Sequence, residues 1–401
     1  MTHFVVIGAG QAGASLVAKL RAEGFEGDIT LIGEEPVPPY QRPPLSKGYL
    51  LGEMAEERLY LRPAEFYGDQ RITLRLGHPV TAVDAVAQTV TVGGDVLGYD
   101  QLAFTTGSRP RRLPDSMGGA LDGVHVVRTL ADVDQMADAF RAGARVLVVG
   151  GGYIGLEAAA VASKTGMQVT LIEMAPRILQ RVASPQTSDH FRALHQAHGV
   201  RIMEGTVLQR LVGDHAVTAA VLGDGTELSV DLVIVGIGIE PCTGLAQQAG
   251  VVCENGIRVD AFGRTSDPQI WAAGDCASFP YRGQRIRLES VQNAIDQAEI
   301  VARNMLGADV AYDPHPWFWS DQYDAKLQIA GLNTGYDRVV TRGQGDAVSF
   351  WYYAGDQLLS VDAVNDPRAY MVGKRLIEGG KSPDADAIAA PDIDLKALLR
   401  A

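Results

Sequence analysis

The fold is decided by a stretch near the N-terminus, FVVIGAGQAG at residues 4–13, and by its near-copy VLVVGGGYIG at residues 146–155. Each copy begins with an apolar run, passes through glycines in the pattern G-x-G-x-x-G, and enters a segment rich in alanine. The apolar run predicts a buried strand, and the alanine-rich segment predicts a helix. Each copy therefore predicts a strand, a tight glycine turn and a helix.

A second strand follows each copy and ends at or beside an acidic residue. The first reads ITLIGE at residues 29–34, and the second reads VTLIE at residues 169–173. Strand, glycine turn, helix, strand and acid, in that order, are typical of a dinucleotide-binding unit. A single dinucleotide needs one such unit, whereas two suggest a flavin and a nicotinamide held together. The sequence thus predicts an α/β protein with two Rossmann-like domains.

In the first unit, the three glycines have separate roles. Gly8 permits the tight turn, Gly10 lets a pyrophosphate approach the backbone, and Gly13 lets the helix pack on the strand. The unpaired N–H groups of the helix start would face the phosphates. Glu34 lies where a carboxylate accepts hydrogen bonds from ribose hydroxyls. We expect FAD at this unit.

The second unit differs in the acid that ends its strand. Glu173 is expected to accept a hydrogen bond from a free 2′-hydroxyl and to repel a 2′-phosphate. The next basic residue is Arg177. This pattern favours NADH over NADPH, and the alternative is a surface acid without a ligand. The glycine turn of this unit contains Gly150, Gly152, Tyr153, Ile154 and Gly155.

A third signal is TSDPQIWAAGD at residues 265–275, a short strand that runs into a Gly-Asp turn. With two glycine turns upstream, Asp275 is expected to contact the ribityl chain or a phosphate of the flavin. Standing alone, the same residues would be an ordinary turn at the end of a strand.

The order of these units predicts four parts. We expect FAD-binding segments at residues 1–106 and 237–312, an NAD-binding domain at residues 107–236, and a C-terminal α+β domain at residues 313–401. The last part is rich in aromatic residues. Two alternating runs in it, joined at Gly355-Asp356, predict an antiparallel hairpin. Helices are predicted near residues 368–378 and 395–399.

Composition excludes several classes of function. The chain has 401 residues, is 46% hydrophobic and carries a formal net charge of −13, which disfavours binding to nucleic acid or an anionic membrane. Three scattered cysteines and eight histidines without ligand spacing predict neither a disulfide framework nor a metal site. Neither a membrane span nor a signal peptide is recognisable, so we expect a cytoplasmic protein.

Taken together, the motifs resemble those of the NADH-dependent ferredoxin reductases that serve oxygenases and cytochromes P450, the putidaredoxin reductase type, within the glutathione-reductase-like flavoproteins. The resemblance covers nearly the whole chain, and its most discriminating block is PWFWSDQY at residues 316–323. Further blocks that carry it are RPPLSK at 42–47, TGSRP at 106–110, WAAGD at 271–275 and ESV at 289–291.

The resemblance implies site residues position by position. Lys47 and Glu157 would form a catalytic ion pair at the nicotinamide side of the isoalloxazine ring. Trp319 would lie by the flavin, near the face where a partner docks. Arg42 and Arg109 would be further flavin-site residues. Contacts to non-covalent FAD are implied for Ala12, Glu34, Lys47, Val80, Arg128, Asp275 and Val291. The nicotinamide pocket would be bordered by Gly236, Ile237, Gly238 and Glu289.

The same resemblance implies the reaction, an NADH-dependent ferredoxin reductase. Hydride passes from NADH to flavin N5, and single electrons then reach a [2Fe–2S] ferredoxin that supplies a cytochrome P450 or another oxygenase. The absence of a cysteine pair at residues 41–52 disfavours a disulfide reductase. Two alternatives stay open, a related reductase that uses rubredoxin, a quinone or a peroxide, and an FAD- and NADH-binding redox sensor.

A local cationic patch is expected to receive the ferredoxin, because ferredoxins are usually acidic and this chain is acidic overall. Its candidate residues are Arg285, Arg287, Arg303, Arg338, Arg342, Lys374 and Arg375.

Overall fold

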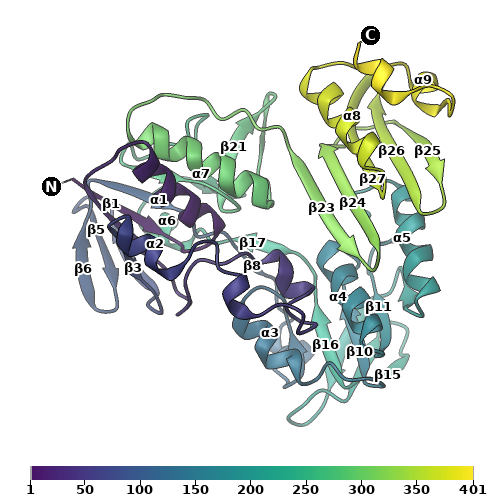
Figure 1. Ribbon diagram of the computed structural model, residues 1–401. Coiled ribbons are helices and arrows are strands. Elements are labelled where there is room, and N and C mark those ends of the chain that lie inside the picture. Colours follow the sequence, from purple (N-terminus) through teal and green to yellow (C-terminus); the bar gives the residue numbers. More distant parts are fainter. Residues whose placement is uncertain (1, 401) are drawn as a thin grey trace. The chain divides into compact units, whose positions relative to one another are not determined.

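The computed structural model describes residues 2–400 and divides by its internal packing into two compact units (Figure 1). Unit 1 comprises the described residues up to Arg42, together with Ala55–Arg109 and Ile239–Pro316. Unit 2 comprises Pro43–Met54, Pro110–Gly238 and the described residues from Trp317 onward. The predicted four-part division of the chain stays a prediction about separate domains.

Unit 1 is built on a parallel sheet whose strands come from distant parts of the sequence. β1 lies at its centre, and the residues of β1 after His3 are fully buried, as the apolar run predicts. Helix α1 (Gln11–Ala22) packs against α7 (Val291–Met305). The strand order is β20 (Ile270–Ala272), β7 (Gln101–Phe104), β1 (His3–Ile7), β2 (Asp28–Ile32) and β3 (Ile72–Arg75).

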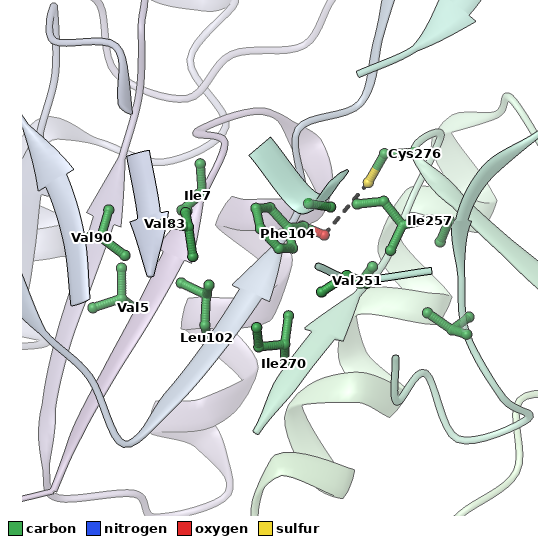
Figure 2. Close-up of a cluster of buried hydrophobic side chains, with 14 of the residues drawn as sticks. Val5, Ile7, Val83, Val90, Leu102, Phe104, Val251, Ile257, Ile270 and Cys276 are labelled. Atoms are coloured by element: carbon green, nitrogen blue, oxygen red, sulfur yellow. Dashed lines mark hydrogen bonds between the residues drawn. The ribbon is translucent and has the colours of Figure 1, made fainter. Parts of the chain in front are cut away.

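One hydrophobic cluster joins this sheet to the smaller sheets of unit 1. Figure 2 shows Val5, Ile7, Leu102 and Phe104 of the parallel sheet among side chains of the smaller elements, such as Val90. The smaller sheets are β4 (Val80–Asp84), β5 (Thr89–Val92) and β6 (Asp95–Gly98), and β18 (Cys253–Glu254), β19 (Gly256–Arg258), β21 (Ala277–Tyr281) and β22 (Gln284–Ile286). Shorter helices are α2 (Ala64–Asp69), α6 (Gly244–Gln248) and the 3₁₀ helix η2 (Glu56–Arg58).

Unit 2 contains a second parallel sheet of the same design. β10 lies at its centre between β11 and β16, and α4 follows β10 through the second glycine turn. The strand order is β12 (Arg201–Met203), β11 (Gln168–Ile172), β10 (Arg145–Val149), β16 (Leu232–Val235) and β9 (Val124–His125). Its helices are α3 (Leu130–Ala137), α4 (Tyr153–Lys164), α5 (Pro185–Ala197) and the 3₁₀ helices η1 (Pro43–Ser46) and η3 (Asp115–Met117). A small antiparallel sheet is formed by β13 (Leu208–Val212), β14 (Ala219–Leu222) and β15 (Glu227–Ser229).

The C-terminal part of unit 2 is an antiparallel sheet with helices. The predicted hairpin is confirmed, since the last two strands of this part pair antiparallel through Gly355-Asp356. The predicted last helix, residues 395–399, is a 3₁₀ helix that begins after the Asp394 cap and ends before Arg400. The sheet order is β23 (Trp317–Gln322), β24 (Ala325–Gly331), β27 (Gln357–Val364), β26 (Ala347–Ala354) and β25 (Arg338–Gln344). The helices are α8 (Pro367–Glu378), α9 (Ala385–Ala389) and η4 (Leu395–Leu399).

The two predicted crossover segments meet in a two-stranded sheet of β8 (Ser108–Pro110) and β17 (Ile239–Pro241). The predicted fold class, two Rossmann-like parallel sheets and a C-terminal α+β part, is confirmed. Within residues 2–400, no helix combines the length and the apolar character that crossing a membrane requires.

Candidate nucleotide-binding sites and active site

The first glycine turn has the geometry that a bound pyrophosphate requires. Gly8 has φ +115°, and a Cβ on it would lie 2.2 Å from the carbonyl oxygen of Thr105. A Cβ on Gly13 would lie 2.0 Å from the carbonyl oxygen of Gly8, so the helix packs directly on the strand. At Gly10, by contrast, a Cβ would meet nothing within 4 Å, and α1 begins there without a side-chain cap. The open space beside free helix N–H groups fits a phosphate.

Asp275 lies beside this turn. It follows β20, and Gly274 before it has φ +81° and approaches Ala12 of α1, so that a Cβ there would lie 3.0 Å from the Ala12 Cβ. Ser108 Oγ donates to Asp275 Oδ2 over 2.8 Å. The Gly274 N–H donates to Gln297 Oε1 over 2.9 Å, which ties the turn to α7. Ala12, Asp275 and the start of α7 at Val291 are thus gathered around one turn.

Other predicted flavin-site residues of unit 1 are arranged differently. Glu34 follows β2 and is exposed, whereas its neighbour Glu35 accepts hydrogen bonds from Tyr40 and pairs with Arg42 at 2.6 Å. Arg109 is 71% exposed and pairs with Glu240 at 2.6 Å.

Two more of the expected residues of unit 1 lie on separate elements. Val80 begins β4, in the small three-stranded sheet, and is half-buried. Glu289 pairs with Arg287 at 2.6 Å, and Arg287 also donates to the Asp275 carbonyl over 3.0 Å. Whether these residues contact FAD or the nicotinamide stays a prediction.

The second glycine turn repeats the geometry of the first. Gly150 has φ +110°, and a Cβ there would lie 2.3 Å from the Gly236 carbonyl oxygen. A Cβ on Gly155 would lie 2.1 Å from the Gly150 carbonyl oxygen, while one on Gly152 would meet nothing within 4 Å. The backbone at Gly236 therefore lies directly against the second glycine turn. Whether Gly236, Ile237 and Gly238 border a bound nicotinamide stays a prediction.

Glu173 is held in one position at the end of β11. Its Oε2 accepts from the Gly151 N–H over 2.6 Å, and its Oε1 accepts from the Ala175 N–H over 2.8 Å. Each carboxylate oxygen keeps a further lone pair for a ribose hydroxyl. Gly151, which the sequence reasoning did not single out, is needed for this contact.

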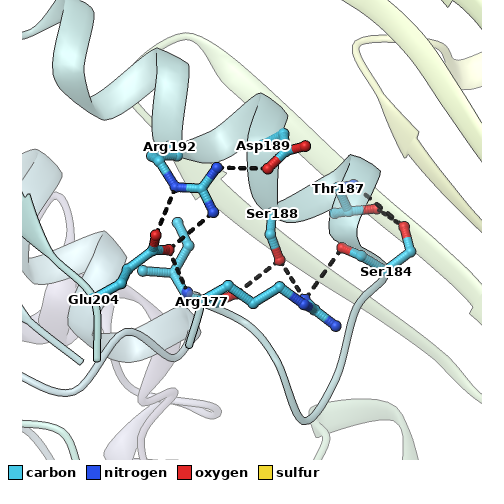
Figure 3. Close-up of polar contacts among 8 residues, drawn as sticks. Arg177, Ser184, Thr187, Ser188, Asp189, Arg192 and Glu204 are labelled. Atoms are coloured by element: carbon cyan, nitrogen blue, oxygen red, sulfur yellow. Dashed lines mark hydrogen bonds and ion pairs between the residues drawn. The ribbon is translucent and has the colours of Figure 1, made fainter. Parts of the chain in front are cut away.

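The first basic residue after Glu173, Arg177, is held by hydrogen bonds to its own loop and to the start of α5. Arg177 donates through Nη1 to Ser188 Oγ over 2.5 Å (Figure 3). It also donates through Nη2 to the Ala183 carbonyl over 2.8 Å. A guanidinium with these partners has few donors left for a 2′-phosphate.

Large apolar side chains are exposed at the same edge of the sheet. Ile154 in the first turn of α4 is 47% exposed, Met174 after Glu173 is 72% exposed, and Ile237 after β16 is 39% exposed. Exposed apolar groups beside a polar turn are typical of a surface that a ligand covers.

Glu157 is the centre of a buried polar cluster in unit 2. It lies on α4 with a relative exposure of 4%, and Lys47 Nζ is 3.1 Å from its Oε1. Ser46 Oγ donates to Oε2 over 2.9 Å, and Ser320 Oγ donates to Oε1 over 2.7 Å. Burial raises the pKa of Glu157, while Lys47 and the two hydroxyls oppose that rise. The expected ion pair is present, and its catalytic role stays a prediction.

Sequence reasoning missed three residues of this cluster, Ser46, Ser320 and Asp321, whose Oδ2 lies 3.8 Å from Lys47 Nζ. A signal was available, because Ser46 directly precedes Lys47 and the other two belong to the block at 316–323. What the sequence did not contain was the packing of β23 and η1 against α4.

Aromatic side chains surround the start of β23. Trp319 is half-buried and lies 5.5 Å from the Trp317 ring, and the rings of Tyr153 and Phe318 are 5.0 Å apart. The Tyr153 hydroxyl is buried and has no hydrogen-bond partner among residues 2–400, and burial raises its pKa well above the ordinary value.

Arg128, a predicted FAD contact, precedes the Thr129 cap of α3 in unit 2.

Most arginines of the expected cationic patch have internal partners. Arg285 pairs with Glu254 at 2.6 Å, and Arg303 pairs with Glu23 at 3.0 Å. Arg342 donates to several carbonyls between Ile388 and Ile393. These guanidiniums stabilise the fold, so their sequence positions are weak evidence for a docking surface.

Together, two glycine turns with room for a phosphate, a carboxylate fixed at the end of a strand and a buried Lys–Glu pair fit an FAD- and pyridine-nucleotide-dependent oxidoreductase. Comparison with known proteins gives the same class. Residues 2–298 match the family model described as pyridine nucleotide-disulphide oxidoreductase, and residues 317–399 match the reductase C-terminal model.

Similar proteins are more specific. A ferredoxin–NAD(P)+ reductase of Sphingomonas sp is 46% identical, with 94% of this chain and 93% of that protein covered. Putidaredoxin reductase of Pseudomonas putida is 41% identical, with 100% and 97% covered. The crystal structure of the covalent putidaredoxin reductase–putidaredoxin complex superposes with a TM-score of 0.96, at 40% identity, over 100% of this chain and 98% of that chain. The chain belongs to the ferredoxin reductase family, and its cofactors are FAD and NAD(P)H.

Proposed function

We propose that the protein takes electrons from NADH and delivers them to a [2Fe–2S] ferredoxin that serves a cytochrome P450 or a ring-hydroxylating oxygenase. One observation carries this proposal. The chain has two glycine turns of the dinucleotide-binding type but no cysteine pair at residues 41–52. Cys242, Cys253 and Cys276 are free thiols. Electrons therefore have no dithiol to pass through and must leave for an acceptor directly. Bound FAD would supply an acceptor for hydride and a donor of single electrons.

Residues of unit 1 would hold the FAD. Gly10 and the N-terminus of α1 leave room for its pyrophosphate, and Asp275 offers a carboxylate fixed by Ser108. The likeness to ferredoxin reductases supports contacts from the other predicted residues of both units. Free thiols in every cysteine suit a reducing compartment, which supports the cytoplasm as the place of action.

Residues of unit 2 would hold and select the coenzyme. Glu173 accepts from a 2′-hydroxyl and repels a 2′-phosphate, and the engaged Arg177 offers that phosphate no compensation. Lys47, held by Glu157, would stabilise negative charge on the reduced flavin. Hydride transfer itself needs close and aligned rings more than an acid or a base.

The test is NADH-dependent turnover with a panel of purified [2Fe–2S] ferredoxins, with rubredoxin, a quinone and hydrogen peroxide as competing acceptors. We expect rapid flavin reduction by NADH and turnover with at least one ferredoxin. Rapid flavin reduction with turnover only on rubredoxin, a quinone or a peroxide would show that a [2Fe–2S] ferredoxin is not the electron acceptor. Slow flavin reduction with a persistent charge-transfer band would instead indicate a redox sensor.

Lys47→Met tests the proposed role of the ion pair. The variant should keep its FAD but be reduced by NADH about tenfold more slowly, the equivalent of ~1.4 kcal/mol in the barrier. Lys164→Met, at the other end of α4 and exposed, is the matched control. Stopped-flow absorbance of the flavin gives the rate. An unchanged rate in Lys47→Met would remove Lys47 from the active site.

A further inference from the structure

Behind the Lys47–Glu157 pair lies a row of buried polar side chains that the proposed chemistry does not use. Ser320, Gln322 and His195 each have a relative exposure of 0%. Ser320 and Gln322 are two residues apart on β23 and therefore share a face of the strand. His195 lies in the last turn of α5. Burying polar groups costs free energy unless each is hydrogen-bonded, so the row must be satisfied internally.

The row is one continuous chain of hydrogen bonds that ends on Glu157. Ser320 Oγ donates to Glu157 Oε1 over 2.7 Å, and Gln322 Nε2 donates to Ser320 Oγ over 3.1 Å. His195 Nε2 lies 2.8 Å from Gln322 Oε1. At the far end, the Tyr323 hydroxyl lies 3.4 Å from His195 Nδ1.

The hydrogen bonds of this row run in one direction, from His195 toward Glu157. Burial lowers the pKa of His195 to about 4 and raises that of Tyr323, so the imidazole is neutral and the phenol keeps its proton. Because Gln322 Oε1 faces His195 Nε2, that nitrogen carries the hydrogen that Oε1 accepts, and Nδ1 is left as an acceptor toward the Tyr323 hydroxyl. The amide nitrogen of Gln322 therefore faces Ser320 and occupies its oxygen as a donor. The Ser320 proton is left for Glu157.

We propose that His195 and Gln322 are positioning residues, which orient the Ser320 hydroxyl so that it always donates to the carboxylate that holds Lys47. This inference rests on the proposed function, because it assumes that the Lys47–Glu157 pair acts in flavin reduction. The opposite tautomer of His195 would turn the Gln322 carbonyl toward Ser320. Ser320 would then donate to Gln322, and Glu157 would lose that hydrogen bond.

Reversing the chain by mutation has a defined consequence. A carboxylate in Gln322→Glu accepts from both His195 and Ser320, so the serine proton leaves Glu157. Glu157 then keeps two direct partners, the Lys47 ammonium and the Ser46 hydroxyl. Asp321 of β23 acts on it only indirectly, through its own contact with Lys47. Its pKa, already raised by burial, rises further. The carboxylate must be ionised to hold Lys47, so activity is lost at a higher pH.

The first measurement is single-turnover reduction of the flavin by NADH in the holoenzyme. Gln322→Glu should lower the limiting rate about tenfold, the loss expected when one hydrogen bond to a charged group is removed. The acid side of its pH profile should move up by about one unit, while the Kd for NADH changes less than about twofold. Gln322→Met removes both hydrogen bonds without adding a charge and should slow reduction in the same direction. His198→Ala is the control, because His198 stacks on the Tyr323 ring and its Nδ1 contacts the Leu194 carbonyl, outside the row of hydrogen bonds that ends on Glu157.

The second measurement does not depend on activity. Long-range ¹⁵N–¹H spectra of histidine-labelled holoenzyme report which ring nitrogen of His195 carries the hydrogen, with His195→Gln identifying its signals. We expect the Nε2–H tautomer in the wild type and a mixture in Tyr323→Phe, which keeps the ring but loses the hydroxyl. A wild-type Nδ1–H tautomer would overturn the inference.

Kinetics separate this inference from the proposed function. If Lys47→Met slows flavin reduction but both Gln322 variants keep the wild-type rate and pH profile, the inference alone is wrong. If Lys47→Met has no effect, the proposed role of the pair is wrong, and the tautomer of His195 still decides whether the chain has the stated direction.

Discussion

The two glycine turns have nearly the same backbone geometry, but the acids that follow them are held differently. Glu34 in unit 1 is exposed and has no hydrogen bond or ion pair within the described residues. Glu173 in unit 2 accepts from two backbone N–H groups. We therefore expect the shared motif to specify where a nucleotide binds, and the rigidly held carboxylate of unit 2 to discriminate between the coenzymes.

The units also differ in what they bury. The buried polar side chains of unit 1 include hydroxyls and amides, such as Gln297 and Asn293, within residues 2–400. Buried titratable acids and histidines in that range are Glu157, His195 and Asp362, all in unit 2. The pH dependence that comes from fully buried acids and histidines should therefore originate in unit 2, because neutral amides do not titrate.

Gly13→Val and Gly155→Val should have the largest effects, because each should abolish nucleotide binding in one unit only. A side chain at either position meets backbone oxygen, 2.0 Å away in unit 1 and 2.1 Å away in unit 2. A cost of ~3 kcal/mol or more is expected, or over about 100-fold in binding. Gly13→Val should be purified without FAD, whereas Gly155→Val should keep FAD that NADH reduces poorly. Absorbance at the flavin bands and NADH titration distinguish the two.

Gly10→Ala and Gly152→Ala are the controls for fold, since a Cβ at either position meets no protein atom within 4 Å. These variants should melt like the wild type but bind their nucleotide less tightly. Loss of FAD from Gly155→Val would mean that the two turns do not act separately.

A second prediction concerns stability between pH 4 and 6. The pKa of His195 is lowered by burial to about 4, so its contribution to stability is lost as pH falls from its ordinary 6.5. The pKa of Asp362 is raised by burial to about 6, so its contribution is lost as pH rises from its ordinary 3.8. The two slopes oppose each other. Asp362→Asn should leave the His195 slope and make unfolding free energy rise with pH, by up to ~3 kcal/mol.

Urea unfolding at several pH values measures this slope. His195→Gln should show the opposite sign, with stability falling as pH rises. Gln297→Met in unit 1 is the matched control, because it removes a buried amide without changing the slope. Equal slopes in all three variants would contradict the assignment of pH dependence to unit 2.

Asp275→Ala should weaken FAD binding in unit 1. The substitution removes a carboxylate and leaves the Ser108 hydroxyl without its partner, at a cost of ~2 kcal/mol, or about 30-fold in Kd. Equilibrium dialysis of released FAD measures the change. Asp267→Ala, a turn acid on the same segment, should keep wild-type affinity.

Glu173→Gln should have the smallest effect and sharpen the comparison of the two acids. Removing the charge relieves repulsion of a 2′-phosphate, so kcat/KM for NADPH should rise about tenfold relative to NADH. Glu204→Gln perturbs the same loop through its contact with the Ile178 N–H and should affect both coenzymes equally. A wild type that uses both coenzymes equally would refute the role of Glu173.

Sequence predicted the features that depend on local pattern. The glycine turns, the strands around them and the β26–β27 hairpin follow from periodicity and turn residues, and the structure contains all of them. The partners of single charges were not predictable, because they are distant in sequence. Ser320 reaches Glu157 across 163 positions, and Arg303 reaches Glu23 across 280. Only the three-dimensional packing decides whether an arginine faces solvent or a carbonyl.

The two hydrogen bonds to Glu157 can form only in a fixed order during biosynthesis. Its two hydroxyl donors come from Ser46 and Ser320, so one donor is made before the carboxylate and the other 163 residues after it. At ~5–20 residues per second, a ribosome needs roughly 8–30 s to travel from Glu157 to Ser320. If α4 packed into the core before Ser320 was made, Glu157 would be buried with one of its two hydroxyl donors missing. Maturation of this centre must therefore wait until β23 has emerged, long after both glycine turns are made.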